Sequence, residues 1–228
     1  MNNPLNRVVW SALTSRQSRI SIGGARARRF DPEISPFAAS KDNSAGALDA
    51  LADLIAPNDA PVFLLQAEQI RLPDTLVAEK TALGVLMTER VATTAKTHDF
   101  EISALSDSDI PEMLTLAELT KPGPFTSRTP ELGTFLGVKL DGRLAAMGGT
   151  RLNLKGFTEI SGLCTHPDHQ GKGLASALTL QIASEIRARG DTPFLHAYAD
   201  NHGAIALYRK LGFEIWDEVN VAVVSRGS

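Results

Sequence analysis

The stretch Thr165-His166-Pro167-Asp168-His169-Gln170-Gly171-Lys172-Gly173-Leu174-Ala175 decides the fold. It follows an apolar run, Ile160 to Cys164, that predicts a buried strand. Apolar residues spaced by four follow it and predict a helix with one apolar face. These residues are Leu174, Leu178, Ile182 and Ile186. The first backbone N–H groups of a helix lack partners and lie at the positive end of its dipole. Glycine there lets a phosphate come close to the backbone, so the stretch predicts an anion site for a phosphorylated cofactor.

Other phosphate-binding loops fit this stretch less well. A P-loop requires Gly, four residues, and then Gly-Lys-Ser/Thr, but Lys172 is followed by Gly173 and no glycine stands at the required distance. A dinucleotide-binding fingerprint would need Gly or Ala where Ser176 stands. The alternative is that Gly171 and Gly173 only form a tight turn between a strand and a helix.

Two motifs in this chain resemble one known family. Gln170-x-x-Gly173-x-Ala175 resembles the Q/R-x-x-G-x-G/A pyrophosphate loop of GCN5-related N-acetyltransferases. About 30 residues further on, Asn201 to Phe213 is similar to the family's closing N-x-x-A-x-x-x-Y-x-x-x-G-F signature, in the same order along the chain. The similarity is greatest to the FR47-like branch and covers roughly Phe100 to Val224, so it favours the cofactor loop over the simple turn.

The resemblance implies where acetyl-CoA would bind as a cosubstrate. Backbone N–H groups of the loop would hold its pyrophosphate, and Lys172 either adds positive charge or is an ordinary solvated lysine. Backbone groups of the preceding strand would pair with the pantetheine arm. The implied cofactor-binding residues are Leu163, Cys164, Thr165, Gln170, Gly171, Lys172, Gly173, Leu174, Ala175, Ser176 and Asn201.

Asn201 and Tyr208 are seven residues apart on a predicted helix, so both project from nearly the same face. By resemblance, Asn201 contacts the cofactor and the phenol of Tyr208 donates a proton to the departing thiolate. The alternatives are that Asn201 caps the helix, which is compatible with a cofactor contact, and that Tyr208 is a half-buried aromatic residue.

Glu159 is the candidate for the base. Glutamate is depleted in strands, yet Glu159 stands in an apolar run eleven positions before Gln170. Its spacing is similar to that of the base glutamate of histone-type GCN5 enzymes. We expect a partly buried carboxylate with a raised pKa that accepts a proton directly or through water. The alternative is a solvent-facing glutamate at a strand end, just after the turn at Gly156.

Four other residues with reactive side chains, one cysteine and three histidines, receive less weight. Cys164 lies in an apolar strand and is expected to be inert core. His166 and His169 lack a third ligand, so no metal is expected. His196 alternates within a predicted strand, where a core position and a position lining the acceptor site are both open.

The chain divides into residues 1–95, a small N-terminal α/β section of unknown role, and residues 96–228, an acetyltransferase domain. The predicted fold is α+β: the GCN5-related acyl-CoA N-acyltransferase fold, with a mixed, mostly antiparallel sheet splayed at the cofactor strand.

The expected strands are Val62–Leu65, Val85–Val91, Phe100–Leu105, Gly133–Leu140, Leu144–Leu152, Phe157–Thr165, Thr192–Ala199 and Ile215–Val224. The expected helices are Ala47–Ile55, Ser108 or Asp109 to Leu119, Leu174 onward, and Asn201–Leu211. Asp141-Gly142 predicts a hairpin.

Composition limits the functional classes. Of the 228 residues, 43% are hydrophobic and 21% charged, as in ordinary globular proteins, and the net charge of -3 favours neither nucleic acid nor an anionic membrane as partner. One cysteine excludes an intramolecular disulfide and suits a reducing cytoplasm. A cytoplasmic monomer or homodimer is expected.

The function expected from these observations is N-acetylation. An amine of a small molecule or peptide would attack the thioester of acetyl-CoA directly in a ternary complex. The alternative is a non-catalytic acyl-CoA-binding regulatory or partner-binding module on the same fold, since fold does not fix function.

Overall fold

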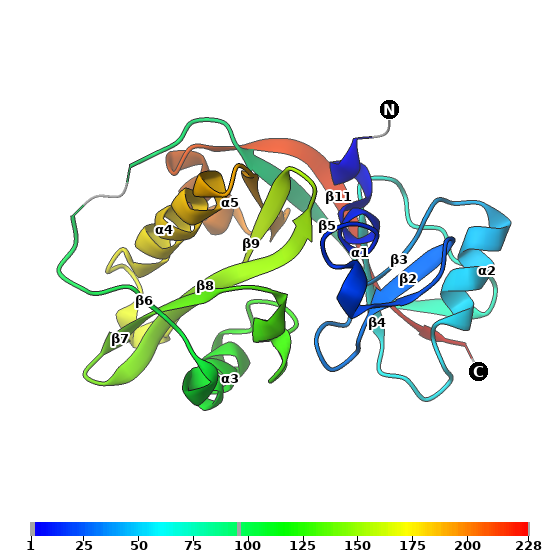
Figure 1. Cartoon of the computed structure of the whole chain (residues 1–228), viewed down its shortest axis with the longest axis horizontal. Coiled ribbons are helices and arrows are strands. Elements are labelled where there is room, and N and C mark those ends of the chain that lie inside the picture. Colours follow the sequence, from blue (N-terminus) through cyan, green and yellow to red (C-terminus); the bar gives the residue numbers. More distant parts are fainter. Residues whose placement is uncertain (1–2, 95–96, 228) are drawn as a thin grey trace.

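A computed structural model describes residues 3–94 and 97–227 of the chain. These residues form a small sheet and a large sheet, with helices on both faces of the large one (Figure 1). The elements in chain order are α1 Val8–Leu13, β1 Ser21–Gly23, β2 Ala27–Phe30, β3 Ala38–Ser40, α2 Ala45–Asp53, β4 Val62–Gln66, β5 Leu76–Glu89, β6 Ser103–Ala104, α3 Ile110–Thr120, β7 Phe135–Leu140, β8 Arg143–Leu154, β9 Phe157–Thr165, α4 Leu174–Ala188, β10 Thr192–Tyr198, α5 His202–Lys210 and β11 Phe213–Arg226.

The large sheet has the strand order β4-β11-β5-β10-β9-β8-β7-β6 within the described residues. Strands β9 and β10 are parallel, and the other neighbouring pairs are antiparallel. The crossover between the parallel strands is α4, as expected for a connection that must return to the same end of the sheet. The predicted mixed, mostly antiparallel sheet is therefore confirmed.

The sheet opens between β9 and β10. The two strands pair only as far as Ile160 and Leu195. Beyond this point β9 continues beside β8, and β10 continues beside β5 as far as Tyr198. Gly162, just past the split, has φ +63°, and a Cβ there would lie 2.9 Å from the Phe135 ring. Glycine thus allows β9 to bend away from β10 at the predicted position.

Alternate residues of these strands face opposite layers. Ile160 and Leu195 pack with the apolar face of α4 and with α5. Phe194, the neighbour of Leu195, packs instead with residues of α1. On this second face α3 packs against β8 and β9, and Figure 1 shows α3 and α4 on opposite sides of the sheet.

The two sections of the sequence share one sheet and one core. Strand β5 lies between β10 and β11 and pairs with β11 from Leu76 to Glu89. Apolar residues of α1 share a buried cluster with Leu152 and Phe194. The two sections are therefore packed against each other. The boundary proposed between residues 95 and 96 lies outside the described residues, and the division into two domains remains a proposal.

The differences from prediction lie outside the cofactor motif. Strand β9 and the start of α4 agree with prediction, and the hairpin at Asp141-Gly142 has φ values of 51° and 76°. Strand β5 begins about nine residues earlier than expected, because its first half, around Glu79 and Lys80, is exposed and shows no apolar alternation. The three-stranded sheet β1-β2-β3 was not predicted.

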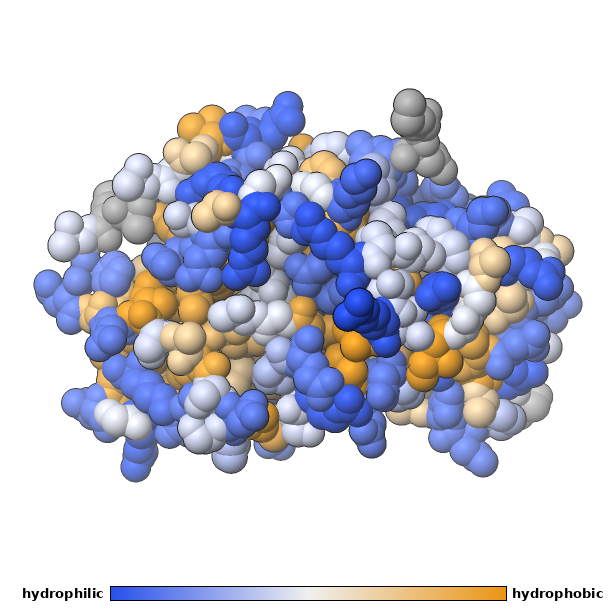
Figure 2. Space-filling model, viewed as in Figure 1, coloured by the Kyte–Doolittle hydropathy of each residue, from blue (hydrophilic) through white to orange (hydrophobic). Residues whose placement is uncertain are grey.

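The surface in Figure 2 is largely hydrophilic, with smaller hydrophobic patches between the polar areas. Among the described residues, no helix is both long enough and apolar enough to cross a membrane.

Candidate active site

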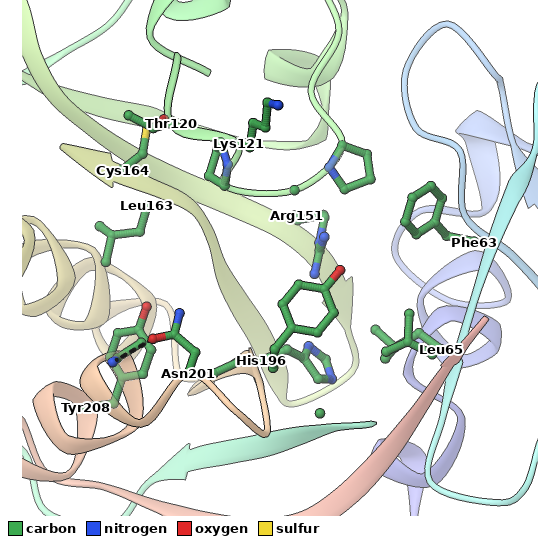
Figure 3. A pocket seen from close by; sticks show the side chains of 18 of the residues that line it. Phe63, Leu65, Thr120, Lys121, Arg151, Leu163, Cys164, His196, Asn201 and Tyr208 are labelled. Atoms are coloured by element: carbon green, nitrogen blue, oxygen red, sulfur yellow. Dashed lines mark hydrogen bonds between the residues drawn. The ribbon is translucent and has the colours of Figure 1, made fainter. Parts of the chain in front are cut away.

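A cavity of about 520 Å³ lies at the split between β9 and β10. Figure 3 shows two sides of it, with Arg151 and His196 between them. We call one the loop side, lined by Leu163, Cys164, Thr165, Pro167, Gln170, Asn201, Ala204 and Tyr208. We call the other the N-terminal side, lined by Phe37, Phe63, Leu65, Gly84, Val219 and Val221. The segment from Leu119 to Pro124, after α3, also lines the cavity.

The loop that precedes α4 has the backbone that the sequence predicts. Gly171 and Gly173 have φ values of +77° and +80°, and nothing lies within 4 Å of the position of a Cβ on either residue. The first helical hydrogen bond runs from the Ala177 N–H to the Gly173 carbonyl, so the N–H groups of residues 174–176 have no partner within the helix. The loop thus presents free donors and open space at a helix N-terminus, which suits a phosphate.

Lys172 is exposed, and its Nζ lies 2.9 Å from Nδ1 of His169. Gln170, next to the glycines, lines the cavity itself. Of the loop residues predicted to bind the cofactor, Gln170 lines the cavity, whereas residues 171–176 follow it in the chain without lining it, and the roles of all of them remain proposals.

The second half of β9 borders the cavity with one free edge. Cys164 and Thr165 pair with Met147 and Ala146 of β8, and the register with β10 has already ended. Thr165 Oγ1 is buried without a hydrogen-bond partner in the described part of the chain. This edge could accept an extended amide chain, as the pantetheine arm of coenzyme A is.

Cys164 is buried, and burial raises the pKa of its thiol to about 11. A thiol of this kind is protonated at neutral pH and is a weak nucleophile.

Asn201 and Tyr208 both line the cavity from α5. Asn201 is the N-cap residue, and its Oδ1 accepts a hydrogen bond of 3.1 Å from the Ala204 N–H, drawn in Figure 3. The side-chain amide N–H groups of Asn201 are not needed for this cap. Tyr208 is partly buried against Phe213, with 6.4 Å between the ring centroids, and burial raises its pKa. A phenol with a raised pKa stays protonated and can donate.

Glu159 differs from the expectation. Its side chain is fully buried and does not line the cavity. Arg151 donates two hydrogen bonds to it, of 2.6 and 2.9 Å, and the Leu152 N–H donates a third of 3.2 Å. Burial alone would raise the pKa, but the Arg151 charge and the hydrogen bonds from Arg151 and His196 outweigh it and lower the pKa to about 2. The expected raised pKa was therefore wrong, because the sequence did not reveal the arginine partner.

For His196 the sequence left a core position and a position lining the acceptor site open, and did not indicate its pairing with Glu159. His196 is the first residue of β10 beyond the split, it lines the cavity, and its Nδ1 lies 2.6 Å from Oε1 of Glu159. Its Nε2 is buried without a partner among the described residues. No local signal could have found this pair, because Glu159 lies 37 residues earlier on the neighbouring parallel strand.

The N-terminal side is apolar and brings in the section of unknown role. Phe63 of β4 packs against Phe37 with 5.6 Å between ring centroids, and Arg151 lies 4.6 Å above the Phe37 ring. Within the described residues, no Asp or Glu lines the cavity, and the cationic side chains that do are Lys121 and Arg151. Over the same residues, no group of three or more His, Cys, Asp or Glu is arranged to hold a metal ion.

Known proteins are similar to this chain in fold and in sequence. Residues 135–221 match the model of the family described as FR47-like protein. A GNAT-family protein of Novosphingobium aromaticivorans has a solved structure with a TM-score of 0.91 and 36% identity, each chain being covered completely. A GCN5-related N-acetyltransferase of Kribbella flavida, at 14% identity and a TM-score of 0.70 over 98% of this chain and 96% of that one, shares the fold.

Curated relatives match mainly one half of the chain. The [ribosomal protein bS18]-alanine N-acetyltransferase of Salmonella typhimurium is 33% identical over 49% of this chain and 79% of its own length. The mycothiol acetyltransferase of Nocardiopsis dassonvillei is 36% identical over 37% of this chain, which spans only 28% of that relative. The chain belongs to the GCN5-related N-acetyltransferase superfamily, a superfamily of acyl-CoA-dependent N-acetyltransferases, and to its FR47-like branch.

Proposed function

We propose that the chain transfers an acetyl group from acetyl-CoA to the amine of a compact, largely apolar small molecule or peptide terminus. The observation that carries this proposal is the cavity at the split of the sheet, which lies between the helix N-terminus with its free N–H groups and the apolar N-terminal side. Acetyl-CoA would enter from the loop side and the amine from the N-terminal side. Family membership supports the reaction class.

The loop side supplies the grip on the cosubstrate. The free N–H groups at the start of α4 and the open space over Gly171 and Gly173 fit a pyrophosphate. The free edge of β9 from Leu163 to Thr165 fits the amide arm, with Asn201 beside it. Bound there, acetyl-CoA supplies an electrophilic thioester carbonyl. These contacts use backbone groups, so most side-chain substitutions in these segments would leave the contacts in place. The two glycines are the exception.

Tyr208 is the proposed acid. Burial raises the pKa of its hydroxyl, so the hydroxyl stays protonated and can give a proton to the departing thiolate. The Cys164 thiol, with a pKa of about 11, is poorly suited to carry the acetyl group. Direct attack by the amine in a ternary complex is therefore favoured over a covalent acyl-enzyme.

The acceptor class follows from the chemistry of the N-terminal side. Phe37, Phe63 and Leu65 offer an apolar wall, which favours an acceptor with an apolar body. Polyamines and aminoglycosides carry several positive charges, and among the described residues no Asp or Glu lines the cavity to bind them. The names of the relatives point to two unlike acceptors, mycothiol and an alanine of a ribosomal protein, so likeness alone does not choose between them.

A combined binding and turnover assay tests this function. Acetyl-CoA binding is measured by calorimetry, and thiol release is followed with 2-phenylethylamine, phenylhydrazine, apolar amino acids, short peptides, spermidine and an aminoglycoside. We expect binding, together with turnover of the apolar acceptors and little turnover of the polycations. Binding without turnover of any amine would favour the non-catalytic module, and absence of binding would overturn the cofactor site.

A further inference from the structure

We propose that His196 is the catalytic base that takes the proton from the attacking amine, and that Glu159 holds its imidazole in the required tautomer. This inference rests on the proposed acetyltransferase function and assigns a role that the family motifs of this chain do not. Glu159 then acts through His196 and does not touch the substrate.

The geometry places one basic nitrogen at the split. His196 follows Leu195, the last residue of β10 that pairs with β9. Its side chain is 10% exposed and lines the cavity between the loop side and the N-terminal side (Figure 3). Its Nε2 has no partner among the described residues, although a buried polar atom usually has one. A ligand amine at the split would supply that partner.

Glu159 determines which nitrogen of His196 carries the hydrogen. The carboxylate, with a pKa of about 2, is ionised at neutral pH and can only accept hydrogen bonds. Because Oε1 of Glu159 lies 2.6 Å from Nδ1, that nitrogen is the donor, and in the neutral imidazole this leaves the lone pair on Nε2. The same carboxylate stabilises the imidazolium that forms when Nε2 takes a proton. The other charged groups around the ring are Arg151 on β8 and Lys121 across the cavity.

The other titratable groups of the cavity are poorly suited to this role. Within the described residues no carboxylate lines it. Burial raises the pKa values of Cys164 and Tyr208, so both stay protonated. Lys121 is a cation. Tyr198, which also lines the cavity, is a phenol and is 48% exposed. Among the described residues, His196 is therefore the cavity side chain that has a basic nitrogen without a hydrogen-bond partner.

The proposed reaction is a direct transfer within one ternary complex. The amine nitrogen forms a bond to the thioester carbonyl carbon, and Nε2 of His196 takes one proton from that nitrogen. The carbon–sulfur bond breaks, and the departing thiolate takes a proton from the Tyr208 hydroxyl. Exchange with solvent returns both side chains to their starting states, so one amine and one thioester give one amide and one thiol.

The first test replaces the base and keeps its hydrogen bond. In His196→Asn the side-chain N–H can still donate to Glu159, but no basic nitrogen remains. With 2-phenylethylamine we expect kcat to fall by about 10²- to 10⁴-fold, while the Kd for acetyl-CoA is unchanged. Phenylhydrazine is a much weaker base, so its nitrogen loses its proton more readily once it has attacked the carbonyl, and the loss of kcat should be smaller. The matched control is His98→Asn, because His98 stacks on Phe100 and does not line the cavity.

A second measurement does not need turnover. Long-range proton–nitrogen NMR correlations on protein labelled at histidine nitrogen report which ring nitrogen carries the hydrogen, and His196→Asn identifies the signal. We expect His196 with hydrogen on Nδ1 near neutral pH. Hydrogen on Nε2, or equal kcat for the parent and His196→Asn, would overturn the base assignment alone. Absence of turnover by the parent with every amine would overturn the proposed function, and the base with it.

Discussion

The loop side of the cavity comes from residues 163–208, whereas the N-terminal side combines residues 37–84 with residues 219 and 221. The loop side presents mainly backbone: free N–H groups at a helix start and a free strand edge. The N-terminal side presents side chains, which are apolar and come from strands far apart in the sequence. We infer that cosubstrate recognition is carried by a local motif and acceptor choice by long-range packing. Changes on one side should therefore leave the other side's ligand unaffected.

The largest effect is expected at the loop. Gly173→Glu places a carboxylate where the pyrophosphate of acetyl-CoA is proposed to bind. The two negative groups repel each other, so the affinity for acetyl-CoA should fall by about 100-fold or more. Gly190→Glu is the matched control, since Gly190 lies after the other end of α4 with φ +82° and open space at its Cβ position. Calorimetry measures both affinities, and circular dichroism checks the fold. Equal losses in the two variants would show that strain, and not the phosphate, explains the effect.

The next effect concerns the proton donor on the loop side. Tyr208→Phe removes the hydroxyl and keeps the ring against Phe213, so kcat should fall by about 10²- to 10⁴-fold while the Kd for acetyl-CoA stays the same. Steady-state kinetics and calorimetry measure the two constants. Equal kcat for variant and parent would show that Tyr208 packs against Phe213 and is not the proton donor.

Glu159 pairs with Arg151 and His196, which lie between the two sides, and its loss should lower stability. Glu159→Gln leaves the Arg151 charge buried without its partner, which costs about 3–5 kcal/mol of unfolding free energy. The double variant Glu159→Gln/Arg151→Met removes both charges and should recover most of that loss. Urea unfolding measures both, and an unchanged stability of Glu159→Gln would contradict the buried pair.

The same pair predicts a pH dependence. The folded pKa of Glu159, about 2, lies below its unfolded value of about 4.3. Its stabilisation is therefore fully present above the unfolded value and is lost as the pH falls toward 2. Urea unfolding of the parent through this range should show the loss, and Glu159→Gln should lack that part of it.

The smallest effect is expected on the N-terminal side. Phe63→Ala opens the apolar wall, so the KM for 2-phenylethylamine should rise by about 10-fold with the acetyl-CoA affinity unchanged. Ile22→Ala is the control, because Ile22 is exposed and does not line the cavity. A weakened affinity for acetyl-CoA in Phe63→Ala would break the separation of the two sides.

The sequence predicts the loop side well because its signals are local. An apolar strand, two glycines and a helical repeat lie within 30 residues, so β9, the loop and α4 follow from short-range rules. The N-terminal side depends on contacts between distant residues. Phe63 reaches the cavity because β4 pairs with β11, and no sequence pattern near residue 63 predicts that pairing.

The pKa of Glu159 also depends on contacts between distant residues, which the sequence does not reveal. Its burial could be inferred from its apolar strand, and burial alone raises a carboxyl pKa. The partners that lower the pKa, Arg151 and His196, lie on the two neighbouring strands and are visible only once the sheet is assembled. A pKa direction predicted from one strand can therefore be reversed by its neighbours.

Hydrogen–deuterium exchange of the full chain with and without acetyl-CoA tests the separation of the two sides most directly. Peptides covering residues 161–176 and 201–208 should become protected, since these segments hold the free N–H groups and line the loop side. Peptides covering residues 37–66 should exchange unchanged. Protection of residues 37–66 without protection of residues 161–176 would contradict the account.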